Sequence, residues 1–169
     1  MDSLSFGNIQ NLDAKNQQVS FTGQKSIIEE TGAQKYRFYA PPFNSKVVDK
    51  KTGKEHHYSL AVELVAVTEE KDKNGNTTGK LITKGTPKLL ENSISLLKYG
   101  NGVFDVDAKD FKLPNTDMVG YRFVLIDEDE LKKSKNLNLA RQNSYLLDSG
   151  AVAEGESGKF SYFSKNRVL

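Results

Sequence analysis

The fold class follows from an aromatic segment near the start of the chain, Tyr36-Arg37-Phe38-Tyr39-Ala40-Pro41-Pro42. Successive side chains on a strand point to opposite faces, so Tyr36 and Phe38 share one face while Arg37 and Tyr39 share the other. The two prolines end the strand because proline cannot donate a hydrogen bond to a neighbouring strand. The segment therefore predicts a strand with one buried face and one polar face.

Further segments of this kind follow along the chain. Alternating apolar residues predict a strand over 58–67, with the even-numbered residues facing inward and the other face half covered. The dipeptide Asn74-Gly75 favours a hairpin turn, and 81–83 would be the return strand. Aromatic and β-branched residues predict strands over 102–108 and 120–127. Acidic residues over 128–130 are followed by Lys132 and Lys133, an order that suits the two ends of a helix, so a short helix or a long loop is predicted over 128–143. At most one or two strands are expected in 144–169.

Several short strands with little helix are typical of an antiparallel β-sandwich. We expect residues 35–165 to form this sandwich and 166–169 to begin a linker to a following domain. Residues 1–34 are rich in polar side chains and predict an extended or partly disordered leader, with one edge strand over 18–23. Within that leader, 26–30 fits either a helical turn or a strand.

Composition excludes several classes of function. The 169 residues suffice for one domain with a core, and the net charge is only +2 with basic and acidic residues interspersed. No nucleic-acid partner is expected, because no basic stripe matches a phosphate backbone. The chain has no cysteine, which excludes disulfides and cysteine-ligated zinc. It has no long apolar run and no secretory signal, so we expect no membrane partner and a cytoplasmic location.

Three segments, taken in order, resemble the immunoglobulin-like module that precedes the catalytic barrel in α-amylase-family glycosidases. They are the aromatic-Arg-aromatic-x-Ala-Pro segment over 36–41, the Gly-x-Gly-Val-aromatic segment over 100–104, and the strand over 120–127 that ends in Ile-Asp. The resemblance implies an immunoglobulin-like sandwich that is not catalytic, packs on a C-terminal catalytic domain of the same polypeptide and binds α-glucan weakly. Sugar-binding members use tryptophan platforms, whereas this chain has no tryptophan. The alternative is a structural or protein-interaction sandwich with no glycan role.

Aromatic faces bind sugars by stacking, and neighbouring polar groups bond the hydroxyls. The candidate platforms are Tyr39, Tyr99 and Phe104, and the candidate polar partners are His57, Lys98 and Asn101. The alternative interpretation of the aromatic residues is packing within the sheets, which is favoured for Phe104 and evenly balanced for Tyr99.

No catalytic residue, metal site or cofactor is expected. His56 and His57 are adjacent, so on a strand they point to opposite faces and cannot hold one metal ion together. A solvated loop is the favoured interpretation of this pair. The carboxylate pairs Asp105 with Asp107 and Asp127 with Asp129 are spaced for one strand face, but surface carboxylates are ordinary and the family resemblance implies no catalytic acid in this module.

Overall fold

The computed structural model describes residues 8–10, 27–39, 44–90, 103–147 and 152–165, and it shows a mainly β protein. The strands are β1 (Asn8–Gln10), β2 (Ile27–Gly32), β3 (Lys35–Tyr39), β4 (Lys46–Val48), β5 (Glu55–Lys71), β6 (Thr77–Lys88), β7 (Val103–Asp107), β8 (Met118–Asp127), β9 (Arg141–Leu147), β10 (Val152–Gly155) and β11 (Gly158–Ser164). A 3-10 turn, η2 (Ala108–Phe111), follows β7, and two short helices, α1 (Glu128–Ser134) and α2 (Leu137–Ala140), follow β8.

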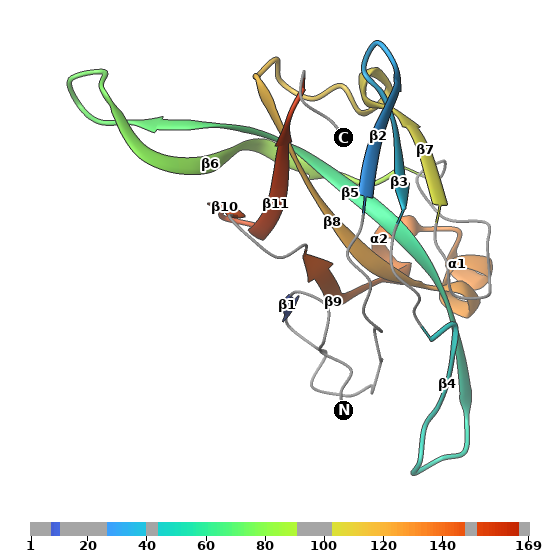
Figure 1. The fold of residues 1–169 in the computed structure, drawn as a ribbon. Helices are drawn as coiled ribbons and strands as arrows, with labels where there is room; N and C mark the ends of the chain where they lie inside the picture. The colour runs from blue at the N-terminus through green and yellow to red at the C-terminus, as the bar shows by residue number, and fades with distance from the viewer. Residues whose placement is uncertain (1–7, 11–26, 40–43, 91–102, 148–151, 166–169) are drawn as a thin grey trace.

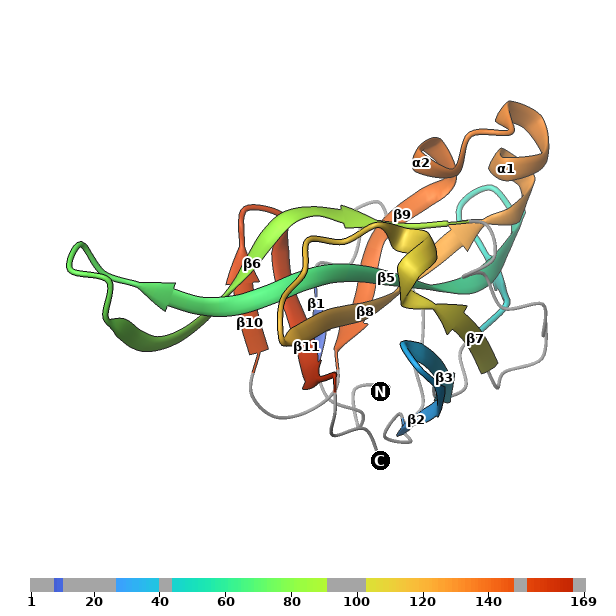
Figure 2. The ribbon, with the colours of Figure 1, turned by 90° about the horizontal axis from the view of Figure 1, so that it is seen from above.

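The strands form two packed sheets (Figure 1). The larger sheet has the order β1-β9-β8-β11-β10-β6-β5-β4, and the smaller has the order β2-β3-β7. Strands β5 and β8 also pair directly, in an unbroken antiparallel register from Tyr58–Asp127 to Val67–Met118. The small sheet lies over this β5–β8 ladder, while the β5–β6 hairpin extends well beyond the body of the protein (Figure 2). The predicted β-sandwich is thus confirmed at the level of packed sheets, and the immunoglobulin-like assignment stays a prediction.

The long ladder makes the larger sheet close on itself at one end. Strand β5 pairs with β6, β6 with β10, β10 with β11, and β11 with β8, which returns to β5. The link between β6 and β10 is a single parallel pair, Ile82 with Glu154. Inside this ring, Val65, Val67 and Phe160 form a buried cluster with Ala153.

The core between the two layers is aromatic. Phe38 on β3 is fully buried, and its ring centroid lies 5.3 Å from that of Tyr121 and 6.4 Å from that of Phe123. Phe104 on β7 stacks on Phe123 with the ring centroids 5.9 Å apart. Such pairs add to the free energy of burial, so these rings hold the small sheet on the large one.

An ion cluster is buried on the opposite face of the ladder. Glu63 on β5 accepts hydrogen bonds from Arg122 on β8, at 2.6 Å, and from two nitrogens of Arg141 on β9, both at 3.0 Å. The Arg122 guanidinium also donates to the Ser157 carbonyl oxygen and lies 4.0 Å from the centre of the Phe160 ring. Charge-assisted bonds therefore join β5, β8, β9 and the β10–β11 turn.

Several sequence expectations need correction or completion. The β5 strand is longer than predicted, and its second face is fully buried at Val65 and Val67 instead of half covered. Residues 27–32 form β2, which pairs with β3, so the boundary expected at residue 34 falls in the turn of a hairpin. The end of the chain contributes β10 and β11 in addition to β9, more than the one or two strands expected. The strand expected over 18–23 lies outside the described residues.

Replacing Gly120 by alanine tests the close packing inside the strand ring. A Cβ atom at Gly120 would lie 2.9 Å from a methyl carbon of Val65 and of Val67, and 3.2 Å from Cβ of Phe160. We expect Gly120→Ala to lower the free energy of unfolding by about 1–3 kcal/mol, as overpacking of a core does, measured by urea denaturation. Gly32→Ala is the control, because its nearest contact would be an ordinary 3.4 Å to the flexible Lys35 side chain. Equal stability of the two variants would contradict the packing.

Removing the charge of Glu63 tests the buried ion cluster. Glu63→Gln leaves two guanidinium groups without their shared carboxylate, and we expect a loss of about 3–5 kcal/mol in unfolding free energy. Glu55→Gln is the matched control, because the Lys46–Glu55 pair is 3.7 Å long and its side chains are about half exposed. It should cost less than about 1 kcal/mol. Similar urea midpoints for both variants would show that the cluster contributes little.

Candidate functional site

Tyr39, the first predicted platform, lies on the outer face of the small sheet. Its side chain is half-buried at the end of β3, and its hydroxyl donates a hydrogen bond to the Glu29 carboxylate on β2. On the same face, Arg37 donates to both oxygens of Asp105, at 2.6 and 3.2 Å. These bonds to Asp105 raise the pKa of Arg37 above its ordinary value. The face thus places one aromatic ring beside carboxylate and guanidinium groups that are able to bond hydroxyls.

Phe104, another of the predicted platforms, faces the other way. Position 104 points into the core, where the side chain is 2% exposed and stacks on Phe123. Its ring therefore contributes to core packing, the alternative interpretation for this residue, and presents no face to a ligand. The odd-numbered neighbour Asp105 takes the outward position, as the strand alternation requires.

His57 lies on β5 and belongs to the larger sheet, so it is not part of the Tyr39 face. Its side chain is 42% exposed, with Nδ1 3.4 Å from a carboxylate oxygen of Asp129 and Nε2 3.4 Å from one of Glu55. Within the described ranges, no group of three or more His, Asp or Glu side chains is arranged to hold a metal ion. The predicted Lys98, Tyr99 and Asn101 lie outside the described residues.

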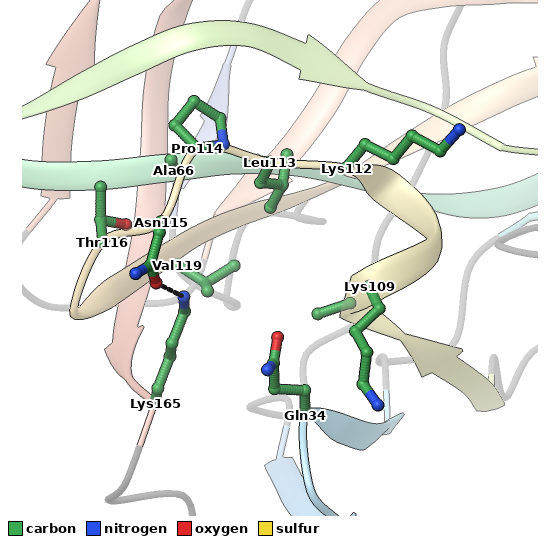
Figure 3. A pocket seen from close by; sticks show the side chains of 11 residues that line it. Gln34, Ala66, Lys109, Lys112, Leu113, Pro114, Asn115, Thr116, Val119 and Lys165 are labelled. Carbon is green, nitrogen blue, oxygen red and sulfur yellow. Dashed lines mark hydrogen bonds between the residues drawn. The ribbon is translucent and has the colours of Figure 1, made fainter.

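A hollow of about 230 Å³ lies at the edge of the interface between the layers (Figure 3). Its wall comes from the β2–β3 turn, the η2 segment, the approach to β8 and the residue after β11. The apolar part of the lining consists of Ala66, Ala108, Leu113, Pro114 and Val119. The polar part consists of Gln34, Lys109, Lys112, Asn115, Thr116 and Lys165. The lining therefore has three lysines and no acidic residue.

Backbone hydrogen bonds hold the wall of this hollow in place. The Gln34 carbonyl oxygen accepts from Ala108 N at 2.9 Å, and the Asp117 carbonyl oxygen accepts from Lys165 N at 2.9 Å. Gly85 on β6, at φ 83°, lets the Pro114 ring approach so closely that an added Cβ would lie 3.2 Å from it. Because every segment of the wall is tied to a sheet or to another segment, the hollow is a preformed feature of the fold.

Sequence reasoning missed the hollow. Its lysines come from positions 109, 112 and 165, and Gln34 comes from a turn in the segment expected to be a leader. No motif spans these positions, because they meet only when β11 pairs with β8 and the β2–β3 turn reaches η2.

Comparisons with protein-family models, with curated protein sequences and with solved structures found no match. Among the described residues, no helix is long and apolar enough to span a membrane. The candidate sites therefore rest on the geometry of this chain alone.

Replacing Tyr36 by phenylalanine tests the wall beside Lys165 through its pH dependence. Burial, and secondarily the charge of Glu30, raise the pKa of Tyr36 above 10.0, and its hydroxyl donates to the Lys165 carbonyl oxygen at 3.4 Å. A raised folded-state pKa contributes stability that is present below the unfolded-state pKa and is lost as the pH rises through the folded-state pKa. We therefore expect the unfolding free energy to fall above about pH 10, and to fall less steeply in Tyr36→Phe. Parallel urea-midpoint profiles against pH would contradict this assignment.

Proposed function

We propose that the chain is a non-catalytic accessory module of an α-glucan-active glycoside hydrolase, which docks on a catalytic domain and binds α-glucan weakly through the Tyr39 face. The observation that carries the proposal is the meeting of the described residues of the three segments that resemble the family motifs. Strand β3 pairs with β7, and residues of both, Phe38 and Phe104, contact Phe123 on β8. A module defined by these motifs would need them in one core.

The Tyr39 face supplies the chemistry for weak glucan binding. Its ring is half-buried and therefore held in place, and Glu29, Arg37 and Asp105 surround it with acceptors and donors. Sugars bind to such faces through C–H groups over the ring and hydroxyl bonds at its edge. Docking has exposed apolar side chains available at Val48 on β4 and Leu139 on α2, which are 51% and 62% exposed.

The alternative function is a structural or protein-interaction domain with no glycan role. It is favoured by the burial of Phe104, which leaves the Tyr39 ring without this second predicted platform, and by the absence of tryptophan from the sequence. Binding to a neutral glucan is expected of the accessory module and not of the interaction domain, so a binding measurement distinguishes the two functions.

Electrophoresis in gels that contain amylopectin or glycogen tests the glucan role. The wild-type chain should be retarded relative to a gel without polysaccharide. Tyr39→Ala should lose about fivefold in affinity, because a stacked ring contributes about 1 kcal/mol. Tyr39→Phe is the matched control, since it keeps the ring and removes only the hydroxyl bond to Glu29; it should migrate close to the wild type.

Two results would contradict the proposal at different points. An unretarded wild type would exclude the glucan role and favour the interaction domain. Retardation that is unchanged in Tyr39→Ala would show that glucan binds elsewhere on the chain. The docking role is tested separately by the coding sequence beyond Leu169, which should continue into an α-amylase-type barrel; an immediate stop codon would contradict docking within one polypeptide.

A further inference from the structure

The lysine-lined hollow points to a second ligand of different chemistry. We infer that it binds the phosphate group of a compact organic phosphomonoester, with the phosphate against Lys165 and Gln34, Lys109 at the opposite rim, and the organic part against Leu113 and Val119. This inference does not depend on the proposed glucan role, because Tyr39 is not among the lining residues.

The charge of the lining favours an anion. Within the described parts of the chain, none of the three lining lysines forms an ion pair with a carboxylate. Of the nearby acids, the Asp107 carboxylate accepts the hydrogen bond from Lys109 N that begins η2, and Asp117 is exposed. Neither these residues nor the exposed Asp110 line the hollow. The lining itself therefore carries three positive charges and no negative charge, although the net charge of the chain is only +2.

The arrangement of donors can be followed in Figure 3. The Lys165 side chain runs along one side of the hollow and donates to Asn115 Oδ1 at 3.5 Å, and the Gln34 amide points in from below. Lys109 lies on the opposite side with its ammonium group directed past Gln34 and away from Lys165, and the Lys112 side chain extends away from the hollow. Lys165 and Gln34 are therefore the expected phosphate contacts, and Lys109 places a second positive charge at the opposite rim.

The residue types favour phosphate over a carboxylate or a nucleic acid. A planar carboxylate is best matched by the fork of an arginine, while lysine binds phosphate as a point charge. Among the lining residues there is no arginine. The volume of about 230 Å³ is below the 300–1,000 Å³ typical of drug-sized ligands. A polymer backbone would need a longer basic track than one hollow provides, so a small phosphomonoester fits best.

Calorimetric titration with glucose 6-phosphate and with inorganic phosphate, at constant ionic strength, tests this inference on the full chain. We expect saturable binding of both, with glucose 6-phosphate the tighter because its sugar covers the apolar floor. The double variant Lys109→Gln/Lys165→Gln should weaken binding at least about tenfold. The matched control is Lys54→Gln/Lys132→Gln, which removes the same charge from exposed positions outside the lining and should stay within about twofold.

Each outcome of the titration supports or overturns the phosphate site. Equal weakening in both double variants would show a general charge effect and overturn the site. Absence of saturable binding by the wild type would overturn it as well. Inorganic phosphate binding as tightly as glucose 6-phosphate would overturn the organic part of the ligand. Far-ultraviolet circular dichroism of the variants verifies that they fold, and a failed glucan gel would leave this result unaffected.

Discussion

The structure depends on the burial of both faces of the β5–β8 ladder. One face is covered by the small sheet through Phe38 and Phe104, and the other by helices α1 and α2 and by strands β10 and β11. A strand pair in a simple sandwich has one face toward the core, whereas this pair runs through the centre of the protein. The remaining strands are arranged around it, including the ring that β6, β10 and β11 close at one end.

This central position explains why the ion cluster is placed where it is. A charge at Glu63 or Arg122 is costly on a strand buried on both faces, unless the charges neutralise each other. Glu63 meets both arginines, and the second of them, Arg141, belongs to β9. The cluster therefore fixes the position of a strand whose own pairing with β8 is interrupted by a register shift.

Local alternation predicted the elements of the central core and the polar face of β3. The opposite faces of Phe38 and Tyr39 follow from a period of two, and the structure confirms them. The strand over 120–127 was also predicted, but β8 is buried along nearly its whole length, so alternation does not decide the position of Phe123. The double burial of β5 was not predictable in full, because Val65 and Val67 show only that a second face is apolar, not what covers it. One or two strands were expected within 144–169 but not their number or positions, because β10 is short and both β10 and β11 are stabilised by pairing with residues far away in the chain. Propensity gives little information about such strands.

The two candidate ligand surfaces also differ in whether local sequence patterns or long-range strand pairing create them. The Tyr39 face arises within one hairpin and its neighbour β7, so a motif in the sequence was sufficient to indicate it. The lysine-lined hollow arises where the ends of non-consecutive strands meet, and only the pairing of β11 with β8 brings Lys165 close to Asn115. The two surfaces also differ in chemistry, since an aromatic ring with mixed charges suits a neutral sugar, while ammonium groups that have no carboxylate partner among the described residues suit an anion. The two proposed ligands, a neutral glucan and a small phosphorylated compound, would therefore make separate contacts with this chain.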